Sequence, residues 1–386
     1  MPQRWRGPPD DSMPSIYLDY AATSPIPPAV RDAMMPWFGE GFGNPSSVHG
    51  SGRRARNAIE ASRDTLAGLL GVAPADLIFT SGGTESNFLA VSGFQGNGQR
   101  VSSPVEHEAV LQPVQSGVGH TARMVLPNEA GVVSVESVRP CLAKGTLASF
   151  MWVNNELGGI NPVREIGEAC REAGACLHTD AVQGPAWSNM NLSELGADLV
   201  TLSAHKVGGP KGIGLLYVAP GTPFKGVSPG GGQERNRRGG TENVPAIVGF
   251  AKAMELLYAN PDRAESLRAL TGSLRIGLRD SLGDLVRINT PDDHSAPHIV
   301  HVSVPGVPAG SGAEMVILGL DLEGIEVSAG SACASGALNA SHVLKALGKA
   351  ELASIRYSIG FGTTAQEIDR AVSATRRVIQ RVLKAL

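Results

Sequence analysis

A lysine on a glycine-rich turn between two apolar runs constrains this chain more than any other feature. The segment Ser203-Ala-His-Lys206 follows the apolar run 197–202 and precedes a second apolar run, 213–218. Each run has the length and composition of a buried strand. Burial and neighbouring charge can lower the pKa of a lysine, whose amine then acts as a nucleophile or base. A surface lysine in a loop is one alternative. A phosphate loop is another, although Lys211 is not followed by the Ser or Thr of a Walker motif.

Length and charge exclude several classes of function. The chain has 386 residues, a net charge of -3 and 42% hydrophobic residues, which is enough for a sizeable core and predicts two domains. The near-neutral balance gives no indication of a nucleic acid or an anionic membrane as a partner. No apolar run approaches the roughly 20 residues of a membrane span. Residues 1–12 lack the apolar region of a signal peptide, so we expect a frayed extension, with Met13 as an alternative start.

The four cysteines, Cys141, Cys170, Cys176 and Cys333, form no Cys-x-x-Cys pair, so no zinc site is expected. They are too few for a disulfide framework, and a reducing cytoplasm fits them. Cys170 and Cys176 are interpreted as small core residues. Cys333 lies in Ala-Gly-Ser-Ala-Cys-Ala-Ser-Gly, where small neighbours favour an accessible, reactive thiol over a packed one.

Apolar strands alternate with helical patterns from about residue 50 to 260, which predicts an α/β fold with a largely parallel sheet. A helical pattern over 246–283 leads into a second, smaller domain. The expected elements are helices at 52–70 and 161–173, strands at 77–80, 150–153, 175–179, 197–202 and 213–218, and second-domain strands near 299–304 and 324–328. The glycine-rich stretch 230–243 is too polar to be core, and its length indicates a function.

Candidate site residues follow several of these strands. The segment Ser81-Gly-Gly-Thr84 separates a predicted strand from a predicted helix, and this geometry binds phosphate groups. Thr84 is a fair candidate for the N-cap of that helix. The alternative to a phosphate site is a plain turn between strand and helix. His107 precedes a helix and is more often structural there. Asn155 and Asp180 stand at strand ends, where ligands gather in parallel sheets. Asp180 is either a helix cap or a carboxylate that pairs with a protonated pyridine nitrogen.

An arginine in a strand pattern, Arg356, needs an anionic partner, and a substrate carboxylate gripped by two hydrogen bonds would supply one. Together these motifs resemble the pyridoxal-phosphate-dependent cysteine desulfurases of the class V aminotransferase superfamily. The resemblance runs from Tyr17-Leu-Asp-Tyr-Ala-Ala22 to Gly362-Thr-Thr-Ala-Gln-Glu-Ile-Asp369. The short loop around Cys333 is similar to that of group I of the family.

The resemblance implies fold type I of the pyridoxal-phosphate enzymes, with a large domain at 16–258, a smaller α+β domain at 259–386, and residues 1–15 nearby or disordered. It also implies a homodimer with shared active sites. The resemblance also implies a role for each candidate residue. Lys206 would form the Schiff base, His107 would stack on the cofactor ring, Asp180 would pair with the ring nitrogen and Gln183 with the ring oxygen. The cofactor phosphate would be held by Gly83, Thr84, Ser203 and His205, and by Thr241 from the other subunit. Asn155 and Arg356 would bind the substrate carboxylate, and Cys333 would take the sulfur.

The implied activity converts L-cysteine to L-alanine and leaves a persulfide on Cys333, for iron–sulfur cluster or other sulfur-cofactor biosynthesis through an acceptor or scaffold protein. Two alternatives stay open. One is a selenocysteine lyase or another class V enzyme, against which Cys333 discriminates. The other is a non-catalytic sulfur-transfer scaffold, whose mark would be loss of Lys206 or Cys333. The pathway served is not predicted.

Overall fold

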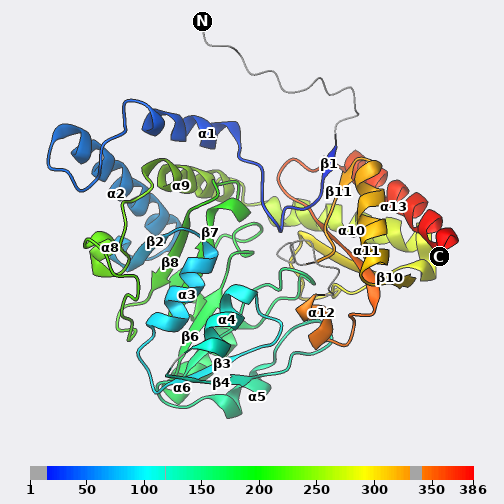
Figure 1. Cartoon of the computed structure of the whole chain (residues 1–386), viewed down its shortest axis with the longest axis horizontal. Coiled ribbons are helices and arrows are strands. Elements are labelled where there is room, and N and C mark those ends of the chain that lie inside the picture. Colours follow the sequence, from blue (N-terminus) through cyan, green and yellow to red (C-terminus); the bar gives the residue numbers. More distant parts are fainter. Residues whose placement is uncertain (1–14, 118, 331–340) are drawn as a thin grey trace, which may run out of the picture.

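A mainly parallel sheet forms the centre of the larger unit in this computed structural model, which describes residues 15–117, 119–330 and 341–386 (Figure 1). Within those residues the sheet has seven strands, and only β8 runs antiparallel to its two neighbours. The order is β2 (Leu77–Thr80), β8 (Gly214–Val218), β7 (Leu199–Ser203), β6 (Cys176–Asp180), β5 (Leu147–Ser149), β3 (Gln99–Ser102) and β4 (Thr121–Met124). The α/β fold predicted from the alternating pattern is therefore confirmed.

The central strands are apolar runs because both faces of the sheet are covered. Every residue of β2, β7 and β8 is buried. The strand expected at 150–153 is wrong in its bounds, since β5 ends at Ser149. The backbone continues irregularly beyond it, where the N–H groups of Phe150 and Trp152 donate to the carbonyls of His178 and Asp180 over 3.0 and 2.9 Å.

Helices cover both faces of this sheet (Figure 1). The helix predicted at residues 52–70 is confirmed as α2, whose C-cap is Gly71 with φ of 69°. Thr84 is not an N-cap as predicted, because α3 already begins at Gly83 after Gly82. The helices of this unit are α1 (Pro28–Met34), α2 (Gly50–Leu70), α3 (Gly83–Gly93), α4 (Glu108–Ser116), α5 (Val135–Val138), α6 (Val163–Ala173), α7 (Leu192–Leu195), α8 (Gln233–Asn236) and α9 (Val244–Tyr258).

The polar stretch 230–243 contributes to the interior, contrary to the prediction that it lies outside the core. Glu234 is buried and forms an ion pair of 2.8 Å with the buried Arg63 of α2. The Phe79 N–H donates to the same carboxylate over 3.0 Å. Glu242 is buried as well. A buried carboxylate needs such partners, and they lie far away in sequence, so the local composition does not reveal them.

The smaller unit contains an antiparallel sheet of β12 (Leu352–Ser358), β10 (Ile299–Pro308) and β9 (Arg287–Ile288). A second pair joins β1 (Ile16–Tyr17) to β11 (Ile325–Glu326) in parallel. Its helices are α10 (Arg263–Leu282), α11 (Ser311–Leu322), α12 (His342–Ala346) and α13 (Ala365–Ala385). Short 3-10 turns complete the described chain at Met35–Phe38, Pro74–Asp76, Arg139–Cys141, Ala204–Lys206 and Gly283–Leu285.

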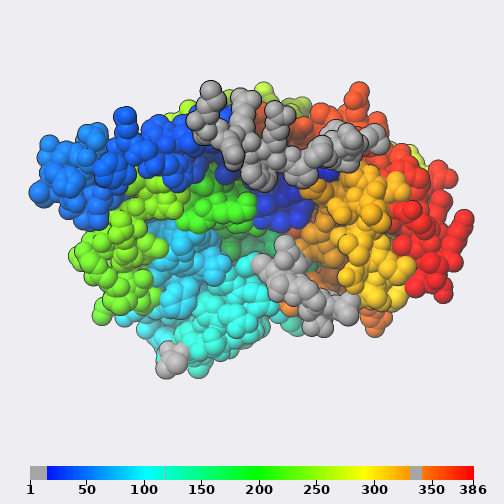
Figure 2. All heavy atoms as spheres, turned by 45° about the horizontal axis from the view of Figure 1, so that its top comes forward, coloured from blue at the N-terminus to red at the C-terminus, as the bar shows by residue number. Residues whose placement is uncertain are grey.

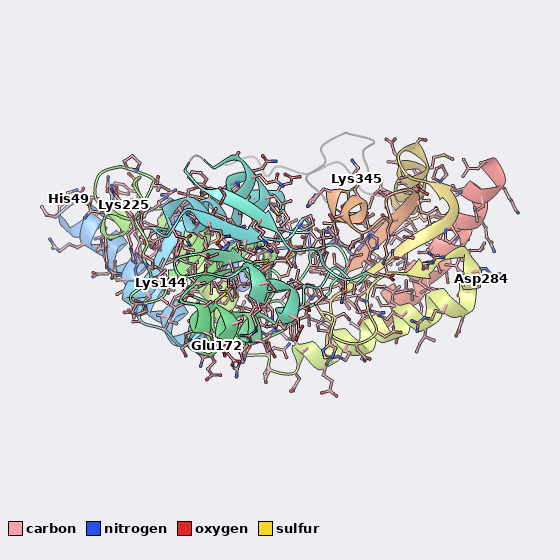
Figure 3. All side chains as sticks on the ribbon, turned by 90° about the horizontal axis from the view of Figure 1, so that it is seen from below. His49, Lys144, Glu172, Lys225, Asp284 and Lys345 are labelled. Carbon is pink, nitrogen blue, oxygen red and sulfur yellow. The ribbon has the colours of Figure 1, made fainter. Side chains whose placement is uncertain are left out.

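The N-terminal segment connects the two units. Ile16 and Leu18 pack in the apolar core of the smaller unit, beside Leu274 and Ile355. In Figure 2 the dark-blue start of the described chain lies between the green larger unit and the gold smaller unit. Figure 3 shows the long helix α10 running along the smaller unit, from the middle of the molecule to the far end that Asp284 marks. The domain limits at 16–258 and 259–386 stay a prediction.

None of the helices in the described ranges combines the length and the apolar character needed to span a membrane.

Candidate active site

A cavity of about 210 Å³ opens at the carboxyl edge of the parallel strands. Its lining comes from segments far apart in the chain: Ala21, Ala22, Gly83, Thr84, Asn87, His107, Met151, Val153, Asn155, Asp180, Val182, Gln183, Ser203, His205, Lys206 and Arg356. Ten of the candidate residues named from the sequence are in this list. The structure therefore brings them together, while the individual role of each stays a prediction.

Lys206 ends the short turn Ala204–Lys206 between β7 and β8. Its Nζ donates to the carbonyls of Ala21 and Ala22, each over 2.8 Å. The Ser24 hydroxyl in turn donates to the Lys206 carbonyl over 2.9 Å. The N-terminal segment thus holds the amine at the cavity wall, beside the ends of the central strands.

Asp180 is the last residue of β6, and both of its oxygens accept hydrogen bonds. The Asn87 amide of α3 donates to Oδ2 over 2.6 Å, and the Val182 N–H donates to Oδ1 over 3.1 Å. Asn87 is nearly fully buried, and its Oδ1 has no partner among the described residues. Asn87 therefore fixes the orientation of the carboxylate, a role that the sequence did not indicate.

Gln183 is held from two sides. Its Nε2 donates to the Ala21 carbonyl over 3.0 Å, and its Oε1 lies 3.2 Å from Nε2 of His298. Burial lowers the pKa of His298 to about 3, and the nearby Arg356 charge acts in the same direction. The imidazole is therefore neutral, and Nε2 carries the hydrogen because an amide oxygen can only accept. Sequence reasoning missed this second neighbour of Gln183.

An anion-binding corner forms where α3 begins. Gly83 and Thr84 occupy its first turn, where backbone N–H groups lack helical partners. Ser203 faces the same cavity, and its buried hydroxyl has no hydrogen-bond partner in the described part of the chain. Because a buried hydroxyl normally finds a partner, this corner fits a bound phosphate group.

His205 lies beside this corner. Its Nδ1 is 3.2 Å from the Thr23 hydroxyl. Burial lowers the pKa of His205 to about 4, and the charges of Lys206 and Lys211 act in the same direction. The ring is therefore neutral at pH 7. It can offer one N–H donor to an anion without adding a charge.

Arg356 lines the same cavity and is only 1% exposed. Its Nη1 donates to the Asn155 carbonyl over 3.0 Å, and its Nη2 donates to Asp19 over 2.7 Å. Its Nε has no partner within the described ranges. A guanidinium with an unsatisfied buried donor suits a planar anion such as a carboxylate.

His107 is the N-cap of α4, where its Nδ1 accepts from the Ala109 N–H over 3.0 Å. Its neighbour Glu106 is fully buried and accepts from the Met151 N–H over 2.7 Å. Burial raises the pKa of Glu106 well above the usual value, and the Asp180 charge acts in the same direction. Ionisation of the Glu106 carboxyl is therefore disfavoured, and sequence reasoning did not single this residue out.

Two candidates are not among the residues that line this cavity in the described part of the chain, for different reasons. Thr241 is exposed and absent from the cavity lining. Cys333 lies outside the described residues. Burial raises the pKa of Cys170 and of Cys176 to about 12, and Cys141 is buried, so these three thiols are poor nucleophiles.

The cavity combines a lysine amine, a carboxylate and an anion-binding corner. It lies on a mainly parallel sheet flanked by helices. Together these features define an enzyme of the fold type I transferase class. The chain belongs to the class-V aminotransferase family, whose model matches residues 16–371. The enzymes of this family depend on pyridoxal phosphate.

Several individual proteins are similar to this chain over nearly its whole length. The cysteine desulfurase IscS of Dictyoglomus turgidum is 40% identical over 379 residues, covering 95% of each chain. A solved NifS-like protein superposes with a TM-score of 0.87 at 32% identity, covering 95% of this chain and 100% of that one. A solved SspA in complex with cysteine gives a TM-score of 0.75 at 31% identity, over 89% of this chain and 98% of that one.

Proposed function

We propose that this chain is a pyridoxal-phosphate-dependent cysteine desulfurase, which converts L-cysteine to L-alanine and retains the sulfur as a persulfide on Cys333. The observation that carries the proposal is the single cavity that brings Lys206, Asp180 and Arg356 together. The similarity to proteins named cysteine desulfurase supports the substrate.

The proposed cofactor fits the residues of the cavity. Its phosphate would lie at the start of α3, where the Ser203 hydroxyl lacks a partner. Asp180, oriented by Asn87, would face the ring nitrogen. Bound pyridoxal phosphate supplies an electron sink that stabilises negative charge at the substrate Cα. The protein supplies binding, orientation and proton transfer.

The residues of this chain bind the substrate, transfer a proton and accept the sulfur. Arg356 and Asn155 bind the carboxylate of L-cysteine. The Lys206 amine takes the Cα proton as a general base. The Cys333 thiolate attacks the substrate sulfur, so that an S–S bond forms and the Cβ–S bond breaks. Cβ keeps the electron pair of that bond and takes a proton, which gives alanine. The transferred sulfur is thereby oxidised and the carbon reduced, so the step needs no outside oxidant.

Cys333→Ser tests this function. The variant should keep its cofactor and still change its absorption spectrum with L-cysteine, because Lys206 acts before the thiol. It should form almost no alanine or persulfide. Mass spectrometry of the wild type after brief exposure to L-cysteine should find one added sulfur on Cys333. Cys176→Ser is the matched control, since that thiol has a raised pKa, and it should keep full activity.

Release of sulfide by Cys333→Ser at the wild-type rate would overturn the persulfide mechanism and favour a lyase or transaminase of the same fold. Absence of any reaction with L-cysteine in the cofactor-loaded wild type would favour a non-catalytic scaffold. Borohydride reduction should attach the cofactor to Lys206 and not to Lys211.

The proposal includes a homodimer with shared sites. Thr241 is exposed and away from the cavity of its own chain, as expected of a residue that serves a second copy. Residues 35–48 also expose large apolar side chains, with Met35 55%, Phe38 64%, Phe42 77% and Val48 88% exposed. A second copy of the chain would cover these side chains. Sedimentation should give a dimer, and Thr241→Ala should retain the cofactor less well; a fully active monomer would refute the shared site.

The persulfide would pass to an acceptor protein for iron–sulfur cluster or other sulfur-cofactor biosynthesis, in a reducing compartment such as the cytoplasm. Support comes from the IscS names of the relatives and from the unpaired thiols of the described cysteines.

A further inference from the structure

A buried histidine of the smaller unit contacts the amide of Gln183, a residue of the cavity wall. His298 is 1% exposed and is not among the described residues that line the cavity. It directly precedes β10 of the smaller unit, whereas Gln183 follows β6 of the larger one. Nε2 of His298 lies 3.2 Å from Oε1 of Gln183. This contact therefore joins the two units beside the cavity.

The backbone of Ala21 fixes the orientation of the Gln183 amide. Its carbonyl, which can only accept, takes a hydrogen from Gln183 Nε2 over 3.0 Å. Oε1 must then face His298, so the imidazole carries its hydrogen on Nε2. Nδ1 of His298 is left bare, and it has no hydrogen-bond partner among the described residues. A flipped amide would oppose two oxygens at Ala21, and a hydrogen on Nδ1 would oppose two acceptors at Oε1.

His298 is itself held in place by the smaller unit. Its carbonyl accepts from the Ile359 N–H over 2.9 Å, and the carbonyl of Pro297 accepts from the Thr271 hydroxyl over 3.2 Å. Burial lowers the pKa of His298 to about 3, so the ring stays neutral. A neutral donor suits the neutral amide of Gln183, because neither group brings an unpaired charge into the interior.

The Gln183 amide lies beside the Lys206 amine. The Ala21 carbonyl that accepts from Gln183 also accepts from Nζ of Lys206 over 2.8 Å. The N–H of Ala21 donates to the Ser358 hydroxyl over 2.9 Å, which holds this shared acceptor in place. An amide nitrogen carries two hydrogens, and in the described part of the chain Nε2 of Gln183 donates only to Ala21. The second hydrogen therefore remains for an acceptor in the cavity.

We propose that His298 is a positioning residue, which keeps the Gln183 amide turned so that it donates into the cavity and thereby favours a cofactor whose ring carries an accepting oxygen. The inference rests on the proposed function, because it takes pyridoxal phosphate as the ligand. A hydrogen-bond donor stabilises negative charge on such an oxygen. His298 acts through Gln183 and has no contact of its own with the cofactor.

Two ligands and two matched variants test the inference, with dissociation constants measured by fluorescence quenching. In His298→Leu, pyridoxal phosphate should bind about fivefold more weakly, as for loss of one neutral hydrogen bond. The deoxy analogue that lacks the ring hydroxyl should bind this variant and the wild type equally, because it has no oxygen to accept from Gln183. His301→Leu is the control, since that imidazole is also fully buried on β10 but lies 3.0 Å from Asn289. It should bind both ligands as the wild type does.

Two further variants separate positioning from a general structural role. A glutamine amide can again donate to Oε1 of Gln183, so His298→Gln should keep most of the affinity for pyridoxal phosphate. The double variant His298→Leu/Gln183→Leu should bind it no more weakly than Gln183→Leu alone, since His298 acts through Gln183. Equal weakening of both ligands in His298→Leu, unchanged affinity for pyridoxal phosphate in that variant, or further weakening in the double variant would overturn the positioning role.

The imidazole hydrogen gives a readout that needs neither cofactor nor activity. Nitrogen NMR of the full-length protein with labelled histidine should find the hydrogen of His298 on Nε2, and the loss of this signal in His298→Gln assigns it. If His298→Leu does not fold, this measurement on the wild type decides. A hydrogen on Nδ1 would overturn the proposed orientation of Gln183. A failure of the proposed function would appear separately, as a wild type that does not bind pyridoxal phosphate or as sulfide release by Cys333→Ser.

Discussion

Arg356 donates from Nη2 to the Asp19 carboxylate over 2.7 Å, so the guanidinium that faces the cavity already has one anionic partner. The side chain of Asp19 is 18% exposed and that of Arg356 is 2% exposed. A buried guanidinium without a counter-charge would be unfavourable in the free protein. Asp19 therefore stabilises the buried Arg356 guanidinium, and a substrate carboxylate would bind beside this pair.

Arg356→Ala should lower kcat/KM for L-cysteine by about tenfold or more, because a hydrogen bond to a charged group contributes roughly 1.5–3 kcal/mol. The bound cofactor should remain, since Arg356 is not one of the residues that form the phosphate corner. Steady-state kinetics and the absorption spectrum of the variant measure the two effects.

Asp19→Asn is the companion variant, because it keeps the shape of the side chain and the charge of Arg356. Its loss in kcat/KM should be smaller than that of Arg356→Ala. A near-normal kcat/KM for Arg356→Ala would show that a different group binds the carboxylate.

Asn87→Leu should weaken cofactor binding by about tenfold, since it removes a 2.6 Å hydrogen bond to the Asp180 carboxylate from a nearly fully buried position. The dissociation constant of pyridoxal phosphate, measured by fluorescence quenching, gives the effect. Phe88→Ala is the control, because that neighbouring side chain is 47% exposed. Equal affinity in Asn87→Leu and the wild type would mean that Asp180 needs no orienting partner.

The sequence was sufficient for the features that depend on local pattern. The bounds of β2 were predicted from Leu77-Ile-Phe-Thr80, since a fully buried strand is a short apolar run. Lys206, Asp180 and Asn155 were selected because each follows a strand, and the carboxyl ends of parallel strands meet at one edge. Their presence at one cavity follows from that topology.

Features that depend on distant partners were missed. Glu234 lies in a polar, glycine-rich stretch, and only the fold brings Arg63 of α2 to it. His298 and Asn87 hold Gln183 and Asp180 through contacts spanning 115 and 93 residues. No local periodicity encodes such pairs. Thr84 was wrongly predicted to be the N-cap of α3. Glycine is also accepted at an N-cap, and Gly82 is the N-cap of this helix.

Glu234→Ala should destabilise the fold by about 3 kcal/mol, because the buried Arg63 then keeps only the more exposed Glu60, 3.3 Å away, as a counter-charge, and the Phe79 N–H loses its acceptor. Urea unfolding of the variant and the wild type measures the difference. Asp32→Ala is the control, since its ion pair with Arg31 is exposed, with side chains 63% and 64% accessible, and it should change stability by less than about 1 kcal/mol. A loss for Glu234→Ala as small as that of the control would contradict a structural role for the buried pair.

The buried histidines predict that stability falls in mild acid. Burial lowers the pKa of His178, His298 and His301 to about 3, below the value of about 6.5 in an unfolded chain. Between these values the unfolded chain binds protons that the folded chain does not. The free energy of unfolding therefore decreases as the pH falls from about 6.5 toward 3, and each histidine contributes at most about 1.4 kcal/mol per pH unit.

Urea unfolding at pH 7.5, 6 and 5 measures this dependence. The wild type should be least stable at pH 5, and the slope between pH 6 and pH 5 should become shallower in His178→Asn, where one titrating group is gone. The slope is the informative quantity, because the substitution also removes the hydrogen bonds of His178 with Ser149 and Thr201, of 2.7 and 3.1 Å, at every pH. An unchanged slope in His178→Asn would mean that this ring is already charged in the folded protein, and that the acid loss comes from other groups.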